Sequence, residues 1–309
     1  MANFPETRWD TEALCRQLTP LLPGLRVEVV ASIGSTNSEL LARARSAGAA
    51  RPDLAPPPCL LVAEHQTQGR GRQGKPWQSR AGASLTFSIA LPLSPVTWSG
   101  LSLAVGLALA EALDPPQPGQ TPRLGIKWPN DLLLRDDPSV GVDGGAGPIG
   151  RKLGGILIET VQIGDCRLAV VGVGLNLLPQ TLAPGAPALS WGQADLQSLR
   201  PGLTPASALA CVAAPLLRAL LDFERAGFAP LRARFAARDL LAGQAVTTTL
   251  AGLPGGIADG VDDSGTLWLR LPGGSAGSVE QRLPVGSGEV SLRAGPDLQT
   301  GPGRGDLTC

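Results

Sequence analysis

The sequence has 309 residues, 43% hydrophobic and 17% charged, a composition that supports a substantial core and excludes a disordered chain. Its 26 basic and 26 acidic residues give a formal net charge of +0, which excludes overall electrostatic attraction to nucleic acid or an anionic membrane. One histidine and five cysteines without a C-x-x-C spacing argue against a structural zinc site. The N-terminus lacks a secretory pattern and the apolar run Leu101–Leu113 is too short to cross a bilayer, so we expect a soluble, cytoplasmic protein.

Hydrophobic periodicity and turn residues predict mixed helices and strands over most of the chain. Helices are expected at Thr11–Leu22, Ser35–Ala47, Leu101–Leu113, Pro205–Ala226 and Pro230–Arg238. Strands are expected at Arg26–Val30, Leu60–Ala63, Ser84–Pro92, Leu124–Trp128, Asp131–Leu134, Gly154–Gln162 and Arg167–Val173. The Gly-, Asp- and Pro-rich stretch Arg135–Arg151 is interpreted as an exposed loop.

Near Gly243 the pattern changes to short strands joined by Gly-rich turns. These strands are predicted at Gln244–Leu250, Gly256–Val261, Thr266–Leu271, Val279–Pro284 and Val290–Arg293. Five short strands within about fifty residues favour a small barrel appended to an α/β domain. We therefore predict a catalytic domain at residues 1–242, a barrel at residues 243–293 and a disordered tail at residues 294–309.

The basic glycine loop, Gly69–Lys75, satisfies two familiar motifs that its context rejects. A dinucleotide fingerprint must open a helix, whereas Pro76 and Trp77 follow here without helical periodicity. A phosphate-binding P-loop requires Ser or Thr where Pro76 stands. What remains is a glycine-rich loop whose two arginines can close around an anion, beside an indole that can contact a planar group. A solvated basic turn or a nonspecific RNA contact would produce the same pattern.

Three further segments carry candidate functional groups. The stretch Lys127–Asp131 offers an amide for a base edge and a carboxylate for a metal or polar neighbour, although Pro-Asn-Asp is also ordinary turn chemistry. Lys152 precedes an apolar strand and can neutralise a ligand charge or remain a surface residue. Glycines within Gly172–Asn176 indicate close approach by a ligand or another strand. The chain has only three lysines, Lys75, Lys127 and Lys152, and all lie in these segments or in the basic glycine loop.

Taken together, these segments resemble the biotin–protein ligase family. The resemblance rests on Ser35-Thr36-Asn37, on Gln66 with GRGRQGKPW, on KWPND at Lys127–Asp131 and on KLGGILIE from Lys152, and it runs from about Gly34 to Arg293. The family implies a mixed sheet flanked by helices, as in class II synthetases, followed by a small SH3-like β-barrel. It also implies an ATP-dependent reaction that forms biotinyl-5'-AMP and transfers biotin to a lysine of a biotin carrier domain.

Carried over residue by residue, the resemblance implies two binding sets. Biotin would be bound by Ser35, Thr36, Asn37, Gln66, Arg70, Gly71, Arg72, Lys152, Gly172 and Gly174. ATP would be bound by Arg72, Trp77, Asn130, Asp131, Lys152 and Asn176, with Arg72 and Lys152 as the catalytic charges. ATP and Mg²⁺ are the expected cofactors, and the metal ligands are left unassigned beyond a possible contact from Asp131.

Two alternatives remain open. A lipoate or octanoate–protein ligase would share the adenylation chemistry, whereas a nucleic-acid-binding module would use the basic loop and the barrel without catalysis. The chain begins about thirty residues before Ser35, so we expect neither an N-terminal helix-turn-helix domain nor specific DNA as a partner. We expect no membrane partner, and a homodimer through paired sheet edges is possible.

Overall fold

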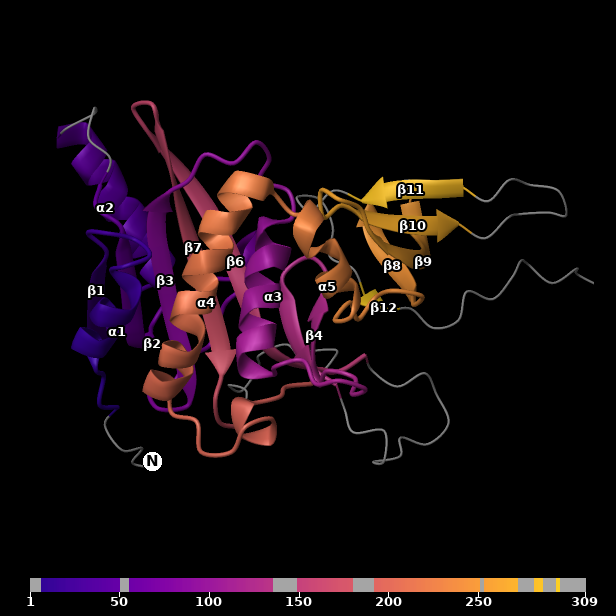
Figure 1. Ribbon diagram of the computed structural model, residues 1–309, viewed down its shortest axis with the longest axis horizontal. Helices are drawn as coiled ribbons and strands as arrows, with labels where there is room; N and C mark the ends of the chain where they lie inside the picture. The colour runs from indigo at the N-terminus through magenta and orange to yellow at the C-terminus, as the bar shows by residue number, and fades with distance from the viewer. Residues whose placement is uncertain are drawn as a thin grey trace, which may run out of the picture.

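A computed structural model describes residues 7–50, 56–135, 149–179, 192–250, 253–271, 281–285 and 293–294 (Figure 1). Most of the predicted Arg135–Arg151 loop and of the predicted tail therefore lies outside the described residues. The described chain forms a large mixed sheet with helices on both faces and a smaller antiparallel sheet beside it (Figure 1). This arrangement confirms the predicted fold class.

The large sheet has seven strands in the order β1-β2-β3-β7-β6-β5-β4. β1 and β2 are parallel, and all other neighbouring strands in the sheet are antiparallel. The central strands β3 and β7 are buried along nearly their whole length, which explains their almost unbroken apolar sequences. The strands are β1 (Arg26–Ile33), β2 (Cys59–Gln66), β3 (Ser84–Pro92), β4 (Leu124–Lys127), β5 (Asp131–Leu134), β6 (Arg151–Ile163) and β7 (Cys166–Asn176).

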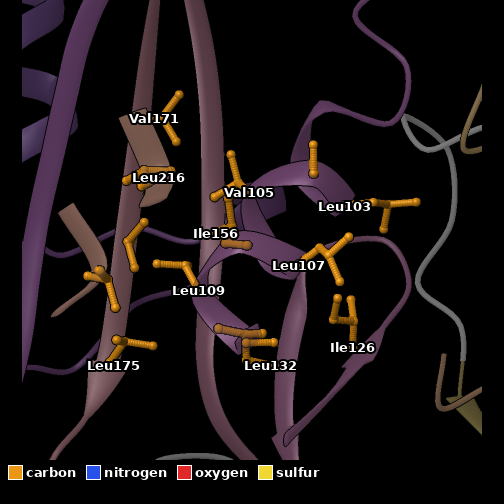
Figure 2. Close-up of a cluster of buried hydrophobic side chains, with 14 of the residues drawn as sticks. Leu103, Val105, Leu107, Leu109, Ile126, Leu132, Ile156, Val171, Leu175 and Leu216 are labelled. Carbon is orange, nitrogen blue, oxygen red and sulfur yellow. The ribbon is translucent and has the colours of Figure 1, made fainter. Parts of the chain in front are cut away.

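Helices cover the two faces of this sheet unequally. α1 (Thr11–Leu18), α3 (Leu101–Leu113) and α4 (Pro205–Ala226) belong to the larger apolar cluster on one face, where α3 packs over β4, β5 and β6 (Figure 2). α2 (Thr36–Ala50) covers the opposite face with a smaller apolar cluster. The first turn of α2 lies beside β3 and β7, so the polar residues that begin this helix lie against the middle of the sheet.

The long helix α4 illustrates how its sequence sets its ends. Thr204 and Ser207 form a reciprocal capping box, Pro205 occupies the first turn, and the helix ends before Gly227. α4 is long and apolar enough to cross a membrane, yet half of its most apolar window is buried inside the protein. Its contacts with α3 identify it as a core helix.

The small sheet begins at Ala245, close to the predicted change at Gly243. Its strands follow the order β11-β10-β9-β8-β12 and pair antiparallel throughout. The indole Nε1 of Trp128 donates to the carbonyl of Gly265, 3.1 Å away, and joins the small sheet to the large one. The strands are β8 (Ala245–Leu250), β9 (Leu253–Val261), β10 (Leu267–Leu271), β11 (Gln281–Val285) and β12 (Arg293–Ala294).

Many boundaries differ from the predicted ones: β1, β2 and β7, for example, are all longer than predicted. Three other differences have a visible local cause. α1 ends at Leu18, where the chain turns before Pro23, instead of continuing to Leu22. The helix predicted at Pro230–Arg238 is a 3-10 turn at Ala229–Leu231 followed by the short α5 (Arg232–Ala236). β6 begins at Arg151, earlier than predicted, because β5 pairs with Arg151 and Lys152 on one side and Gln193 forms a bridge with Lys152.

Candidate functional site

A cleft opens on the α2 face of the large sheet and brings together segments that lie far apart in the sequence. Every predicted binding residue except Asn176 lines it. The cleft residues are Ser35, Thr36, Asn37, Gln66, Arg70, Gly71, Arg72, Gln73, Lys75, Pro76, Trp77, Phe87, Lys127, Pro129, Asn130, Asp131, Lys152, Gly155, Ile156, Leu157, Gly172, Val173 and Gly174.

One end of the cleft is an uncharged polar floor formed by Ser35, Thr36, Asn37 and Gln66, all of them buried. The backbone N–H of Thr36 donates to Gln66 Oε1 at 2.7 Å, so the end of β2 is tied to the start of α2. The Thr36 hydroxyl lies 2.6 Å from Ser88 Oγ, and Ser88 Oγ donates to Asn37 Oδ1 at 2.6 Å. Side chains held in this way present fixed donors and acceptors to a small polar ligand.

The other end of the cleft is basic. Arg72 donates from Nη1 to Asn130 Oδ1 at 3.2 Å, and Lys152 Nζ lies 2.8 Å from Asp131 Oδ1. Burial lowers the pKa of Arg72 from its ordinary value, while the charge of Asp131 opposes this shift. The two cations and the polar pair Asn130 and Asp131 thus converge on one place, which suits an anion that must be partly desolvated.

A β-bulge in β6 aims Lys152 into the cleft. Leu132 pairs with Gly154 but Leu133 pairs with Lys152, so Leu153 is an extra residue on β6. Because side chains alternate along a regular strand, Lys152 would otherwise face away from Gly155, three positions along. The bulge instead buries Leu153 in the core and leaves Lys152 Nζ 3.8 Å from the position of a Cβ on Gly155.

The two glycines of β7 leave room for side chains of the protein itself. A Cβ on Gly172 would lie 2.3 Å from Asn37 Oδ1, and a Cβ on Gly174 would lie 2.4 Å from Cε2 of Trp77. The glycines were predicted to admit a ligand or another strand, whereas in this structure the close approach is made by the side chains of Asn37 and Trp77. The indole of Trp77 lines the cleft between the polar floor and the basic end. Its buried Nε1 has no hydrogen-bond partner among the described residues.

The two arginines of the basic glycine loop point to different ends of the cleft. Arg70 donates from Nη2 to Glu159 Oε1 at 2.7 Å, whereas Arg72 reaches Asn130. In this structure the two side chains have different protein partners, and a shared contact with one anion stays a prediction. The loop between them is closed by backbone hydrogen bonds from the N–H of Gly71 to the carbonyl of Lys75 and from the N–H of Trp77 to the carbonyl of Gly69.

Asn176 is the predicted binding residue that the structure does not place among the residues lining the cleft. Its amide Nδ2 donates to the carbonyl of Ala194 at 3.2 Å and lies 3.4 Å from that of Lys152. These contacts support the backbone that carries Lys152. A contact with ATP stays a prediction.

Two polar residues next to the cleft received no role in the sequence analysis. Ser88 lies in the middle of an apolar strand, and only the tertiary structure brings it against α2. Glu159 lies two residues after Leu157, a cleft residue, so period-two alternation along KLGGILIE could have indicated that it shares this face.

The cleft has few carboxylates that could bind a metal ion. Asp131 is the one acidic side chain among the described residues that line the cleft. In the described part of the chain, no group of three or more His, Cys, Asp and Glu side chains could hold a metal ion. Since Mg²⁺ is often held by one or two carboxylates together with substrate phosphates, Asp131 fits a shared site but not an all-protein metal site.

Comparison with known proteins identifies the family. A profile of the biotin/lipoate A/B protein ligase family matches residues 44–176. The chain is 36% identical to the biotin–[acetyl-CoA-carboxylase] ligase of Mycobacterium tuberculosis, over 85% of this chain and 91% of that protein. The chain belongs to the biotin protein ligase family. It is also 31% identical to the bifunctional ligase/repressor BirA of Escherichia coli, over 90% of this chain and 78% of that protein.

The fold agrees with solved structures of this family. The biotin protein ligase from Aquifex aeolicus, solved in complex with biotin and ATP, has a TM-score of 0.63 and 22% identity, covering 87% of this chain and 99% of that one. At this identity the similarity shows the shared fold, including the small domain after the large sheet.

Proposed function

We propose that this chain is an ATP-dependent biotin–protein ligase that forms biotinyl-5'-AMP and transfers biotin to a lysine of a carrier protein. The observation that carries the proposal is the cleft itself, in which a buried polar floor and a pair of cations lie at opposite ends. Biotin has the matching shape, with an uncharged ureido ring at one end and a carboxylate at the other. Relatives from Mycobacterium tuberculosis and Paracoccus denitrificans are named as biotin–[acetyl-CoA-carboxylase] ligases, and one similar structure contains biotin and ATP.

The polar floor favours biotin over lipoate or octanoate. Thr36, Asn37 and Gln66 can hydrogen-bond a ureido ring, with further donors and acceptors from Ser35 and Gly172 beside them. A dithiolane ring or an alkyl end has no matching N–H or C=O, so it would cover these polar groups without gaining a hydrogen bond from them. A site built to hydrogen-bond its substrate can reject an analogue without those groups by roughly 10⁴-fold.

The basic end can lower the barrier of the first half-reaction. A carboxylate oxygen of biotin forms a bond to the α-phosphorus of ATP, and the bond from that phosphorus to the departing pyrophosphate breaks. Because both reactants are anions, repulsion opposes their approach in a partly dry cleft. Arg72 and Lys152, held by Asn130 and Asp131, can neutralise this charge and stabilise the transition state.

The same cleft can protect and then use the product. Biotinyl-5'-AMP is a mixed anhydride that water hydrolyses, and the basic glycine loop together with Trp77 can exclude water from it. In the second half-reaction the amine nitrogen of the acceptor lysine attacks the acyl carbon. The bond from that carbon to the phosphate oxygen breaks, AMP leaves with the electron pair, and the amine loses a proton.

Further assignments belong to this proposal. Trp77, Asn130 and Asn176 are proposed for the nucleotide, and Asp131 would help to hold Mg²⁺, which supplies charge neutralisation at the phosphates. The acceptor is proposed to be the biotin carrier domain of a carboxylase, and the location the cytoplasm. Dimerisation through a sheet edge and the lack of a DNA partner stay predictions.

The test is transfer of labelled biotin to a purified carrier domain with ATP, with lipoate and octanoate as competing substrates. We expect incorporation of biotin that requires ATP and the acceptor lysine, with AMP and pyrophosphate as products. Incorporation of lipoate alone would replace this proposal with the lipoate ligase alternative. Affinity for RNA or DNA that falls steeply with salt, without any binding of biotin, would favour the nucleic-acid alternative.

A further inference from the structure

Glu159 lies at the polar end of the cleft, near the far end of β6 from Lys152. The two residues are at most about 23 Å apart along the strand, at about 3.3 Å per residue. One carboxylate oxygen of Glu159 accepts from Asn37 Nδ2 at 2.9 Å, and the other accepts from Arg70 Nη2 at 2.7 Å. Glu159 thereby joins the start of α2 to the basic glycine loop without itself being among the cleft-lining residues.

We propose that Glu159 is a positioning residue for the ureido ring of the ligand, acting through Asn37, Ser88 and Thr36 on one side and through Arg70 on the other. This inference rests on the proposed function. It adds a residue that does not touch the ligand but sets the direction of the hydrogen bonds that do.

Glu159, Asn37, Ser88 and Thr36 form a hydrogen-bond chain, and the carboxylate of Glu159 sets the direction of its hydrogen bonds. An ionised carboxylate can only accept hydrogen bonds, so the amide nitrogen of Asn37 must face Glu159. The second Nδ2 hydrogen of Asn37 is directed to the carbonyl of Leu157, 3.2 Å away. Asn37 Oδ1 must therefore face the opposite way, where it accepts from Ser88 Oγ at 2.6 Å.

The hydrogen-bond chain continues from Ser88 through Thr36 to the ligand. A hydroxyl has one proton, and Ser88 has already given its proton to Asn37. The 2.6 Å contact between Ser88 and Thr36 is consequently one in which Thr36 donates. The Thr36 hydroxyl also lies 3.1 Å from Gln66 Oε1, a longer contact than the 2.6 Å one with Ser88, and Gln66 Oε1 already accepts from the Thr36 backbone N–H at 2.7 Å. With its proton given to Ser88, the Thr36 hydroxyl oxygen has lone pairs left to accept a hydrogen bond beside the cleft. A cyclic urea has two N–H donors, which is the complement that such an acceptor requires.

The ion pair between Arg70 and Glu159 positions the basic glycine loop and contributes little to the free energy of folding. Arg70 has about half of its side-chain surface exposed, at 47%, and exposed pairs contribute little to folding. Its position within the basic glycine loop matters instead, because the pair anchors the loop to the polar floor at a point two residues before Arg72. The loop is thereby held across both ends of the cleft.

Replacement of Glu159 by glutamine separates this role from a merely structural one. The amide keeps the size of the side chain but has one acceptor oxygen, so it can serve Asn37 or Arg70 and not both. We expect Glu159→Gln to weaken binding of biotin alone about tenfold, since a hydrogen bond to a charged group is lost. The KM for biotin should rise by a similar factor, with little change in the KM for ATP or in kcat.

Exchanging the amide of Asn37 with the carboxylate of Glu159 tests the direction of the hydrogen-bond chain. In the double variant Asn37→Asp with Glu159→Gln, the glutamine oxygen can accept from Arg70 while its nitrogen donates to the new carboxylate, which still accepts from Ser88. The double variant should therefore bind biotin more tightly than Asn37→Asp alone, in which two carboxylates face each other. Recovery would be partial, because the carbonyl of Leu157 loses its donor.

Calorimetry with biotin is the measurement, and Glu28→Gln is the matched control. Glu28 also accepts from an arginine, Arg43, but on the outer strand β1, so its replacement should leave the affinity unchanged. The inference is overturned if Glu159→Gln binds biotin within twofold of the unaltered protein, or if the double variant binds no better than Asn37→Asp alone. If Glu159→Gln does not fold, the comparison of the double variant with Asn37→Asp still decides. Absence of biotin binding by the unaltered protein would instead overturn the proposed function.

Discussion

The contact between Gly174 and Trp77 gives a quantitative test of how the cleft is built. A Cβ on Gly174 would lie 2.4 Å from Cε2 and 2.6 Å from Cζ2 of the indole. Carbon atoms pack at about 3.5–4.0 Å, so the indole of a Gly174→Ala variant must move by about 1 Å or more. Overpacking of this kind costs about 1–3 kcal/mol.

The cost should be seen in ligand binding as well as in folding, because the indole lies in the cleft. We expect Gly174→Ala to weaken biotin binding about tenfold, since about 1.4 kcal/mol corresponds to a factor of ten. Calorimetry with biotin, together with urea denaturation, measures both effects. Gly106→Ala is the matched control, because its Cβ would meet its nearest neighbour, Ile156 Cδ1, at an ordinary 3.5 Å. That change lies within helix α3 and should leave binding unchanged and stability equal or slightly higher.

The penalty of Gly174→Ala should vanish when the indole is removed. If the indole is the obstacle, adding Gly174→Ala to a Trp77→Ala variant should have almost no further effect. Unchanged affinity and stability in Gly174→Ala would refute the argument. A penalty that persists without the indole would refute it equally, because the cost would then arise from the strand and not from the cleft.

Three further predictions concern the basic end of the cleft and the thiols. Arg72→Gly should release biotinyl-5'-AMP and label lysines of bystander proteins, detectable by avidin blotting; retention of the intermediate would contradict the role of the loop. Lys152→Arg should slow ATP–pyrophosphate exchange, by up to about 10²–10³-fold, because the longer planar guanidinium can still pair with Asp131 but cannot place a compact charge where the ammonium lies; an unchanged rate would remove Lys152 from the chemistry. Burial, with a contribution from Glu28, raises the pKa of Cys59 to about 12, so at pH 8 the thiol stays protonated. Mass spectrometry after alkylation at pH 8 should find Cys59 unmodified in the folded protein and modified after unfolding, and rapid modification in the folded state would contradict its burial.

Several elements could be predicted from the sequence with their observed ends. Ser84–Pro92, Leu101–Leu113 and Pro205–Ala226 have the same bounds in the structure as in the prediction. Each is strongly apolar, and turn or capping residues stand directly beside it, so its local preference agrees with its burial. Where local signals were weak, as after Leu18 and around Pro230, the predicted helices were too long.

The motifs of the sequence determined which residues meet in the cleft. Ser35-Thr36-Asn37, the basic glycine loop, KWPND and KLGG were linked by resemblance, and the structure brings all four to one place. Sequence could identify these segments because each needs particular residue types: small ones for close approach, amides and hydroxyls for a polar ligand, and cations for an anion.

Only the tertiary structure decided which way these side chains point. The bulge at Leu153 turns Lys152 into the cleft, and it arises from pairing with β5, which a strand pattern alone does not reveal. The hydrogen bond from Ser88 to Asn37 and the contacts of Arg70 and Asn37 with Glu159 join residues more than fifty positions apart. Such contacts depend on the order and register of the strands, because a shift of one residue in β3 or β6 would carry Ser88 or Glu159 to the other face of the sheet.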